Sequence, residues 1–531
     1  MTTLYPGGLD SLTNPASSDP LSSGHAAQHA NVNDAVEAIE AELGVNPSGV
    51  HATVADRVAN VEGAAASLQF AAAGSVLQNL PTRTGDAENL MKQAVLWLDA
   101  AHSSASGQTL TNLGWGGSAL NATLGSTGSA DSNDPKFLDW SGSNYVYSPG
   151  SAGNGMTIPH AGTTWPTGDI DIRAYVALDD WTPGSISHVV SRWFSSANLC
   201  WVLIVNTGGT LGLWYTTDGT GGTAQFTAST VATGVTDGAA KWIRVTRSSS
   251  TGDIKFYLSD DAVTWTQLGS TVTSAAASTF NGTTVTGIGC GPALDSPLSG
   301  KVYRAQVLNG ISGTPVLDVD TSLVAGNSTS FTALTGQTVT VNRATSGRKT
   351  ACVTHPVWLF GTDDYMEVAD NDLIDFGATD SFTIVMLGRQ WATPTNYGKW
   401  LNKSNNYPNY AIDTNTTSLQ MRFTAIDSGA AHVVAQSTAT FTAGQALVVA
   451  GVLDRGAVTG SVYLNGTLAS SGSAASLGSL ANADALRIGR FSGASTSYQD
   501  FEFVAAAIFR RALSAAEITT ITNYMTGRVG A

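Results

Sequence analysis

The sequence is poor in charge. Charged residues make up 12% of its 531 residues, against roughly 25% in an ordinary soluble protein. The 40 acidic residues outnumber the 25 basic ones and give a formal net charge of −15. No cluster of Lys and Arg is present that would neutralise nucleic-acid phosphates or anionic lipid headgroups. We therefore expect no nucleic acid among its partners.

Cysteines and long apolar runs are also scarce. Cys200, Cys290 and Cys352 are far apart and lack the spacing of metal ligands, so we expect them to be buried as small apolar residues. The longest apolar runs, such as residues 446–453, fall well short of the ~20 residues that cross a bilayer. The first ten residues show no signal peptide. We expect a soluble protein, assembled in a cytoplasm and without membrane insertion.

The low charge does not indicate disorder. The chain contains 13 Trp, 14 Tyr and 16 Phe, enough aromatic surface to offset the conformational entropy lost on folding. Its length suggests about three structural units rather than one.

The first 89 residues differ in pattern from the rest. Residues 1–21 contain three prolines and no apolar period, which predicts an extended attachment arm. Residues 22–68 carry two short heptad patterns and predict a helical trimerisation stalk. Residues 69–89 read as a linker. The predicted trimer contacts are His25, His29, Val32, Val36, Ile39 and Leu43 in the first helix and Val54, Val58 and Val61 in the second. For the two histidines, a neutral polar layer is favoured over a metal site.

From residue 90 onward, short apolar and aromatic runs alternate with Gly, Asn, Asp and Thr turns, the pattern of antiparallel β-sandwiches. Several segments recur in order. AVLWLDA (94–100) returns as TPVLDVD (314–320), FLDWSGSNYV (137–146) as WLFGTDDYMEV (358–368), KFYL (255–258) as SVYL (461–464), and Ile288-Gly289 as Ile488-Gly489. We therefore predict a mainly β chain with two antiparallel β-sandwiches, 90–316 and 317–531, behind a short N-terminal coiled-coil stalk.

Two segments resemble known families. Residues 358–390, with VYLNGTLASSG, LRIGRF and the last strand and helix, resemble a laminin-G-like domain of the concanavalin A-like superfamily. Residues 25–58 resemble the stalk of minor tail proteins of phages that infect actinobacteria. The second resemblance implies a homotrimer in a virion tail, with an arm that binds other tail proteins. Together the two imply binding to host cell-wall glycan.

The superfamily resemblance also implies a calcium ion, because many members bind one through Asp side chains and loop carbonyls at the rim of the sandwich. The candidate ligands are Asp363, Asp364, Asp370 and Asp372. The alternative, which we favour, is that these carboxylates cap their own turns. We expect no other cofactor.

Sugar binding needs aromatic faces beside hydrogen-bonding loops. The richest such stretch lies between residues 391 and 410, and its candidate residues are Trp391, Tyr397, Trp400, Tyr407 and Tyr410. Trp115 and Trp181 are the corresponding candidates in the first sandwich. The alternative is that these rings belong to the core. Because the second sandwich is farther along the chain from the stalk, we expect it to carry recognition.

We expect no enzymatic activity. Glucanases of the superfamily need paired carboxylates, and their ExDxxE strand motif is absent. Asp169 and Asp171 supply only half of it, and Glu517 is better explained as a helix cap with Ser514. The predicted function is a structural tail protein that binds host glycan. The alternatives are a purely architectural tail-tip spacer and a tail-associated polysaccharide depolymerase.

Overall fold

The computed structural model describes residues 84–529, apart from 103–106, 126, 161–164, 196, 327, 392–396, 404–406, 408, 416–417 and 492–497, and also describes residues 32–34, 36, 37 and 39. The chain divides into two compact units, Met1–Leu80 and Pro81–Ala531. Residues 84–89, the end of the predicted linker, instead form part of helix α3 (Thr84–Met91). The predicted arm, the second stalk helix and residues 69–83 lie outside the described residues. So do the contacts predicted for His25, His29, Leu43, Val54, Val58 and Val61.

In the first unit, the described residues are helical and present an apolar stripe. Val32, Val36 and Ile39 are 60%, 37% and 57% exposed. Their 4,3 spacing places the three side chains along one side of the helix. The trimer itself stays a prediction.

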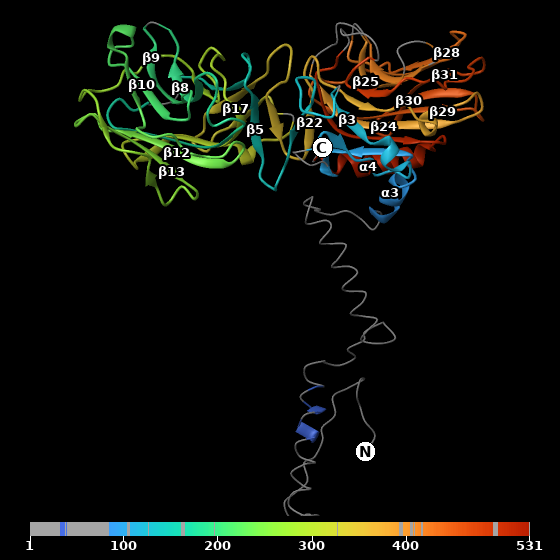
Figure 1. The fold of residues 1–531 in the computed structure, drawn as a ribbon, viewed down its shortest axis with the longest axis horizontal. Coiled ribbons are helices and arrows are strands. Elements are labelled where there is room, and N and C mark those ends of the chain that lie inside the picture. Colours follow the sequence, from blue (N-terminus) through green and yellow to red (C-terminus); the bar gives the residue numbers. More distant parts are fainter. Residues whose placement is uncertain are drawn as a thin grey trace, which may run out of the picture. The chain divides into compact units, whose positions relative to one another are not determined.

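The described residues of the second unit form four antiparallel sheets, whose strands are drawn in Figure 1. Sheet C has the order β14-β13-β12-β7-β17-β5-β21, with β15 beside β13 and β18 beside β17. Its strands are β5 (Tyr145–Pro149), β7 (Ile170–Leu178), β12 (Ala240–Arg247), β13 (Asp253–Ser259), β14 (Thr266–Gln267), β15 (Val272–Thr273), β17 (Ser299–Asn309), β18 (Thr314–Asp320) and β21 (Ala351–Val353).

Sheet D has the order β11-β10-β9-β8-β16-β6-β20-β19. Its strands are β6 (Gly155–Ile158), β8 (Ser187–Trp193), β9 (Leu199–Val205), β10 (Leu211–Tyr215), β11 (Gln225–Ala228), β16 (Thr286–Ile288), β19 (Ser330–Thr332) and β20 (Thr338–Asn342). Alternate residues of β9 and β10, among them Trp201, Leu203, Leu213 and Tyr215, enter one buried core with β7 and β17. Sheets C and D therefore pack face to face, and we call them sandwich I.

Sheet A has the order β31-β30-β29-β24-β33-β22-β4, with β1 beside β33, and sheet B has the order β2-β3-β23-β32-β25-β26-β27-β28. The strands of sheet A are β1 (Leu96–Asp99), β4 (Lys136–Leu138), β22 (Val357–Leu359), β24 (Phe382–Gln390), β29 (Ala446–Asp454), β30 (Thr459–Leu464), β31 (Thr467–Ser473) and β33 (Phe501–Phe509). Those of sheet B are β2 (Thr109–Leu110), β3 (Ala122–Leu124), β23 (Met366–Val368), β25 (Gly398–Lys403), β26 (Asn409–Thr414), β27 (Met421–Ile426), β28 (His432–Gln436) and β32 (Leu486–Ile488). These two sheets share a second core and form sandwich II.

The helices of the second unit are few and short. Two α-helices, α3 (Thr84–Met91) and α4 (Ala515–Thr526), contact each other. Residues of both join the buried cluster on the outer face of sheet A. The described residues also form five 3-10 helices: η1 (Ala100–His102), η2 (Gly117–Leu120), η3 (Gly221–Thr223), η4 (Thr321–Leu323) and η5 (Asp372–Ile374). At the start of α4, Ser514 and Glu517 form a capping box, which confirms the prediction for Glu517.

The two sandwiches have the same strand order. Reading sheet C against sheet A, β13, β12, β7, β17, β5 and β21 take the places of β30, β29, β24, β33, β22 and β4. Sheets D and B correspond in the same way, from β11 and β28 at one edge to β19 and β2 at the other. The prediction of a mainly β chain with two antiparallel sandwiches is therefore confirmed.

The boundaries predicted at 90–316 and 317–531 are wrong, because the N-terminal strands of the two repeats are exchanged. The first arm, β1–β4 (96–138), completes sandwich II rather than the strands that follow it. The second arm, β18–β21 (314–353), completes sandwich I. Figure 1 shows the blue and cyan segments α3 and β3 among the orange and red strands of sandwich II. Sandwich I is thus inserted into sandwich II.

This exchange explains which repeats were correctly matched. AVLWLDA and TPVLDVD form β1 and β18, which occupy equivalent places beside β33 and β17. The matches between β13 and β30 and between β16 and β32 are also equivalent. The match of 137–146 with 358–368 is not: Phe137 in β4 and Trp358 in β22 are paired neighbours in one sheet.

The junction between the sandwiches is well packed. Tyr145, Tyr147 and Val353 of sandwich I join Leu138 and Leu359 of sandwich II in one buried cluster. Ion pairs cross the junction, among them Lys136 with Asp179 at 3.0 Å, Arg348 with Asp364 at 2.7 Å and Lys349 with Asp500 at 3.2 Å.

Two further observations concern membrane-spanning helices and thiols. Among the described residues, no helix combines the length and apolar character needed to cross a membrane. Cys200, Cys290 and Cys352 are buried free thiols, as predicted. Burial raises the pKa of Cys290 to about 12 and that of Cys352 to about 11, which keeps both unreactive.

Candidate functional site

The four aspartates named as candidate calcium ligands do not converge. Asp364 is fully buried, and both its oxygens accept from Arg348. Asp363 and Asp372 are exposed, the latter in η5. Asp370 accepts from Lys403 at 2.6 Å. Among the described residues, no group of three or more His, Cys, Asp or Glu side chains is arranged to hold a metal ion.

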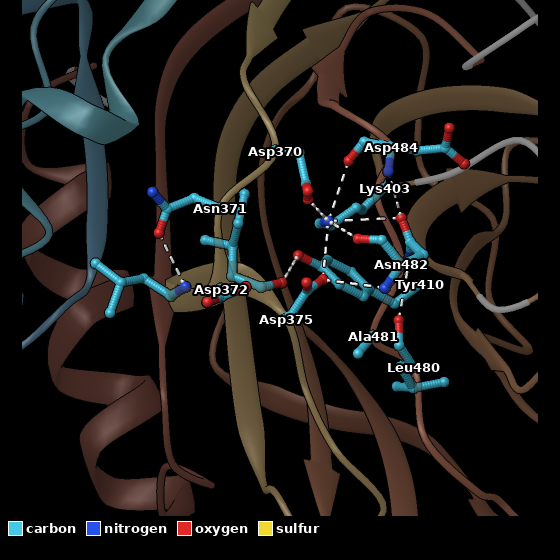
Figure 2. A network of polar contacts seen from close by, with 12 residues as sticks. Asp370, Asn371, Asp372, Asp375, Lys403, Tyr410, Leu480, Ala481, Asn482 and Asp484 are labelled. Atoms are coloured by element: carbon cyan, nitrogen blue, oxygen red, sulfur yellow. Dashed lines mark hydrogen bonds and ion pairs between the residues drawn. The ribbon is translucent and has the colours of Figure 1, made fainter.

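Asp370 instead belongs to an oxygen cage around the Lys403 ammonium, at the end of β25 (Figure 2). The carboxylates of Asp370 and Asp375 lie 2.6 and 2.8 Å from Nζ. The main-chain oxygens of Asn482 and Asp484 lie at 2.9 and 3.0 Å, and the Asn482 amide oxygen at 3.5 Å. The lysine side chain is 0% exposed. The sequence analysis named Asp370 as a candidate ligand but did not identify Asp375 or Lys403.

Two arginines fix the same pair of loops, which connect β23 to β24 and β31 to β32. Arg510 donates to the carbonyls of Asp372, Leu373 and Asp375. Arg455 donates to the carbonyls of Gly377 and Gly478. This rim of sandwich II is therefore held by cationic side chains that satisfy backbone oxygens.

Two of the five predicted sugar-binding aromatics lie in the core. Trp400 and Tyr410 are 0% exposed. The Trp400 indole donates to Gln390 at 2.9 Å, and the Tyr410 hydroxyl donates to the carbonyl of Ile374 at 2.8 Å. Both were assigned to a loop but lie in strands β25 and β26. Burial raises the pKa of Tyr410 well above its usual value.

The other three aromatics lie near the surface. Tyr397 and Tyr407 are 39% and 56% exposed, and the Arg422 guanidinium stacks on the Tyr397 ring at 4.1 Å. Trp391 is half-buried, with Arg343 stacked 3.8 Å from its ring and its indole donating to Glu502 at 3.2 Å. These rings are separated by contacts with cations and do not form one continuous apolar surface.

A continuous aromatic row lies in sandwich I, where the sequence analysis did not place one. Trp193 in β8, Trp214 in β10 and Phe226 in β11 follow one another on the outer face of sheet D. Their ring centroids are 5.7 Å apart from Trp193 to Trp214 and 4.7 Å apart from Trp214 to Phe226. Phe226 is 44% exposed and both tryptophans are half-buried.

The strand register explains why these rings point outward. Leu211, Leu213 and Tyr215 of β10 enter the core, so the alternate residues Gly212 and Trp214 face away from it. Trp214 pairs with Phe226 on one side and with Val202 on the other. The sequence signal was the alternation in LGLWY, which identifies Trp214 as the outward residue once the strand is known. Of the residues considered earlier, Trp181 is core, whereas Trp115 is 55% exposed.

Asp169 and Asp171, the two carboxylates considered for catalysis, both accept hydrogen bonds, Asp169 from the main-chain N–H and the hydroxyl of Ser249. Asp171 is buried and accepts from both Arg173 and Arg244. Glu367 accepts from Arg487, and Glu502 from Arg389.

Residues 360–519 match the model of the concanavalin A-like lectin/glucanases superfamily, of the laminin G type. No curated protein sequence matches the chain. Among solved structures, the binding domain of Paraclostridial Mosquitocidal Protein 1 is similar, with 16% identity and a TM-score of 0.29 over 32% of this chain and 44% of that one. The chain thus spans less than half of that protein's structure.

Two other solved structures are similar over most of their own length. Domains LG4-5 of the mouse laminin α1 chain have 11% identity and a TM-score of 0.26, over 73% of this chain and 94% of that one. The CBM40 domain of Ruminococcus gnavus IT-sialidase, bound to α2,3-sialyllactose, has 14% identity and a TM-score of 0.25, over 28% of this chain and 91% of that one. The residues that match the superfamily model, 360–519, all lie in the part of sandwich II that follows sandwich I in the chain.

Proposed function

We propose that the protein is a structural component of a bacteriophage tail, and that it binds host cell-surface glycan through the aromatic row of sandwich I. The observation that carries the glycan proposal is the row Trp193, Trp214 and Phe226, three touching rings at the surface of one sheet. The apolar faces of sugar rings pack on such aromatic surfaces, while their hydroxyls stay in water or bind nearby polar groups.

The chain connections favour sandwich I over sandwich II for this role. The chain leaving the N-terminal segment enters sandwich II first, through α3 and β1–β4. Along the chain, sandwich I is connected at both ends to strands of sandwich II, β4 and β22. Our earlier expectation, that the second half of the sequence carries recognition, rested on chain order, and the exchanged arms remove that argument.

The tail assignment rests on the resemblance of residues 25–58 to phage stalks and on the exposed stripe Val32, Val36 and Ile39. Such a stripe is covered when helices associate. In a trimer, three copies of a weak glycan site would act together on a repetitive cell-wall polymer, and this raises the apparent affinity. The arm 1–21 would bind other tail proteins.

The test of this proposal compares Trp214→Ala with Trp115→Ala on the full chain. Binding of the fluorescently labelled protein to host cell walls should fall by roughly tenfold or more in Trp214→Ala, because a central aromatic contact commonly contributes this much. Trp115 is an exposed tryptophan outside the row, so Trp115→Ala should bind normally. Equal binding by both variants would favour the architectural spacer. Release of reducing ends from the polysaccharide would favour the depolymerase.

A further inference from the structure

Lys403 has the surroundings of a metal ion rather than those of an ordinary hydrogen-bond donor. Five oxygens lie within 3.5 Å of its Nζ, and two of them belong to carboxylates. An ammonium has only three N–H groups, so it cannot donate to all five at once. Two carboxylates, two main-chain carbonyls and an amide oxygen are the ligand types that hold calcium in proteins. Figure 2 shows these oxygens converging on the nitrogen from several sides.

The cage is ordered by contacts of its own. The main-chain N–H of Asp484 donates to the Asn482 amide oxygen at 3.0 Å, and that of Asn482 donates to Asp375 at 3.3 Å. On the other side of the β23–β24 loop, Arg510 holds the carbonyl of Asp375. The positions of the oxygens therefore do not depend on Lys403 alone.

Sandwich I has a cation at the equivalent position. Val190 in β8 pairs with Ile288, and Leu401 in β25 pairs with Ile488. Two residues further along each strand are Arg192 and Lys403. Both are fully buried, and both extend toward the loop that precedes the equivalent strands β16 and β32.

The Arg192 cage has the same main-chain character but no carboxylate. Its guanidinium donates to the Asn281 amide oxygen at 2.9 Å and to the carbonyls of Gly282 and Thr284 at 2.6 and 3.4 Å. The fourth contact is His160 Nδ1 at 3.0 Å. Burial and the nearby Arg192 lower the pKa of His160, consistent with a neutral ring that accepts this hydrogen bond.

We propose that Arg192 and Lys403 are tethered cations that take the place of a metal ion at one rim of each sandwich. In sandwich II the cage formed by Asp370, Asp375, Asn482 and Asp484 is a latent divalent-cation site, and calcium is the ion its hard oxygen ligands fit. The lysine keeps this rim ordered without calcium. The Arg192 cage has no carboxylate to balance a divalent charge, so it forms no such site.

The experiment measures thermal melting of the full chain in EDTA and in millimolar calcium. The wild type should melt at the same temperature in both. Lys403→Ala leaves two carboxylates without their cation, so it should melt lower in EDTA and recover by several degrees in calcium, since a ligand that binds only the folded state stabilises it. Arg192→Ala is the matched control and should be destabilised equally in both conditions.

Two further variants separate a calcium site from a general salt effect. Lys403→Met fills the cage with an uncharged side chain of similar length, so calcium should give no recovery. Lys403→Ala combined with Asp370→Asn removes one carboxylate and should lose most of the recovery. If Lys403→Ala is too unstable to purify in EDTA, refolding with calcium and terbium luminescence excited through the nearby Tyr410 give the second readout. A calcium-dependent wild type, or a Lys403→Ala variant that calcium does not stabilise, would overturn the proposal.

Discussion

Phe137 and Trp358 are register partners across β4 and β22, and their ring centroids are 4.9 Å apart. The first belongs to the arm that precedes sandwich I, and the second to the strand that follows it. This contact closes sandwich II around the inserted sandwich I. It also means that neither half of the sequence contains a complete domain.

The exchanged arms predict which fragments fold. A fragment 317–531 lacks β1–β4 and should not melt cooperatively, because the sandwich II core then loses a buried set of apolar side chains: Val95, Leu96, Leu98, Leu110, Leu120 and Leu124. A fragment 140–355 contains all of sheets C and D and should fold alone. Circular dichroism during heating measures both.

The matching control joins residues 84–139 to 356–531 through a short Gly-Ser linker. This chain contains every strand of sandwich II and should melt cooperatively. A cooperative transition for 317–531 by itself would contradict the exchange of arms.

Trp400→Ala should destabilise sandwich II rather than only weaken glycan binding. Truncating a fully buried Trp costs about 3–5 kcal/mol of unfolding free energy, and here it also leaves Gln390 without its 2.9 Å partner. Tyr407→Ala is the control, since this ring is 56% exposed, and its midpoint in urea should match the wild type. Equal urea midpoints for the two variants would show that Trp400 does not contribute to the core.

We expect the protein to lose stability in acid because His355 is buried. It lies in the connection 354–356 between the sandwiches, and burial, with a smaller contribution from Arg389, lowers its pKa from 6.5 to about 3. The folded state therefore resists protonation, whereas the unfolded chain takes up a proton below its ordinary pKa. The stabilising contribution is complete above pH ~6.5 and is lost progressively as the pH falls toward 3.

The variant His355→Gln cannot take up this proton. Its unfolding free energy, measured by urea titration between pH 7 and pH 4, should fall less steeply than that of the wild type. The same slope in both proteins would show that other groups govern the acid sensitivity.

The predicted stalk implies a trimeric assembly. Light scattering on the full chain should give the mass of a trimer, and Val36→Asp should weaken it, because a carboxylate would enter the predicted helix contact. Glu37→Gln, on the neighbouring position, is the control. Removal of residues 1–80 should leave a folded monomer, since the second unit is compact without them. A monomeric full chain at micromolar concentration would argue against the stalk.

The sequence predicted the sandwiches because alternation and turns are local signals. It did not predict the exchange of arms, because β1 and β18 have similar apolar patterns. From sequence alone, either strand could pair with β17 or with β33. Which pairing wins depends on packing between segments far apart in the chain. The ion pair of Asp370 was missed for a similar reason: its cation, Lys403, comes from β25, and nothing near Asp370 in sequence indicates it.

The insertion also has a mechanical consequence. Sandwich I is attached through two connections, 139–144 and 354–356, and both meet sandwich II at the adjacent strands β4 and β22. If sandwich I binds a glycan as proposed, a pulling force on the protein divides between two covalent links instead of passing along one. Tension between the N-terminal segment and α4 would cross sandwich II without stretching sandwich I at all. Sandwich I would then stay folded and bound to its ligand while sandwich II carries the mechanical load.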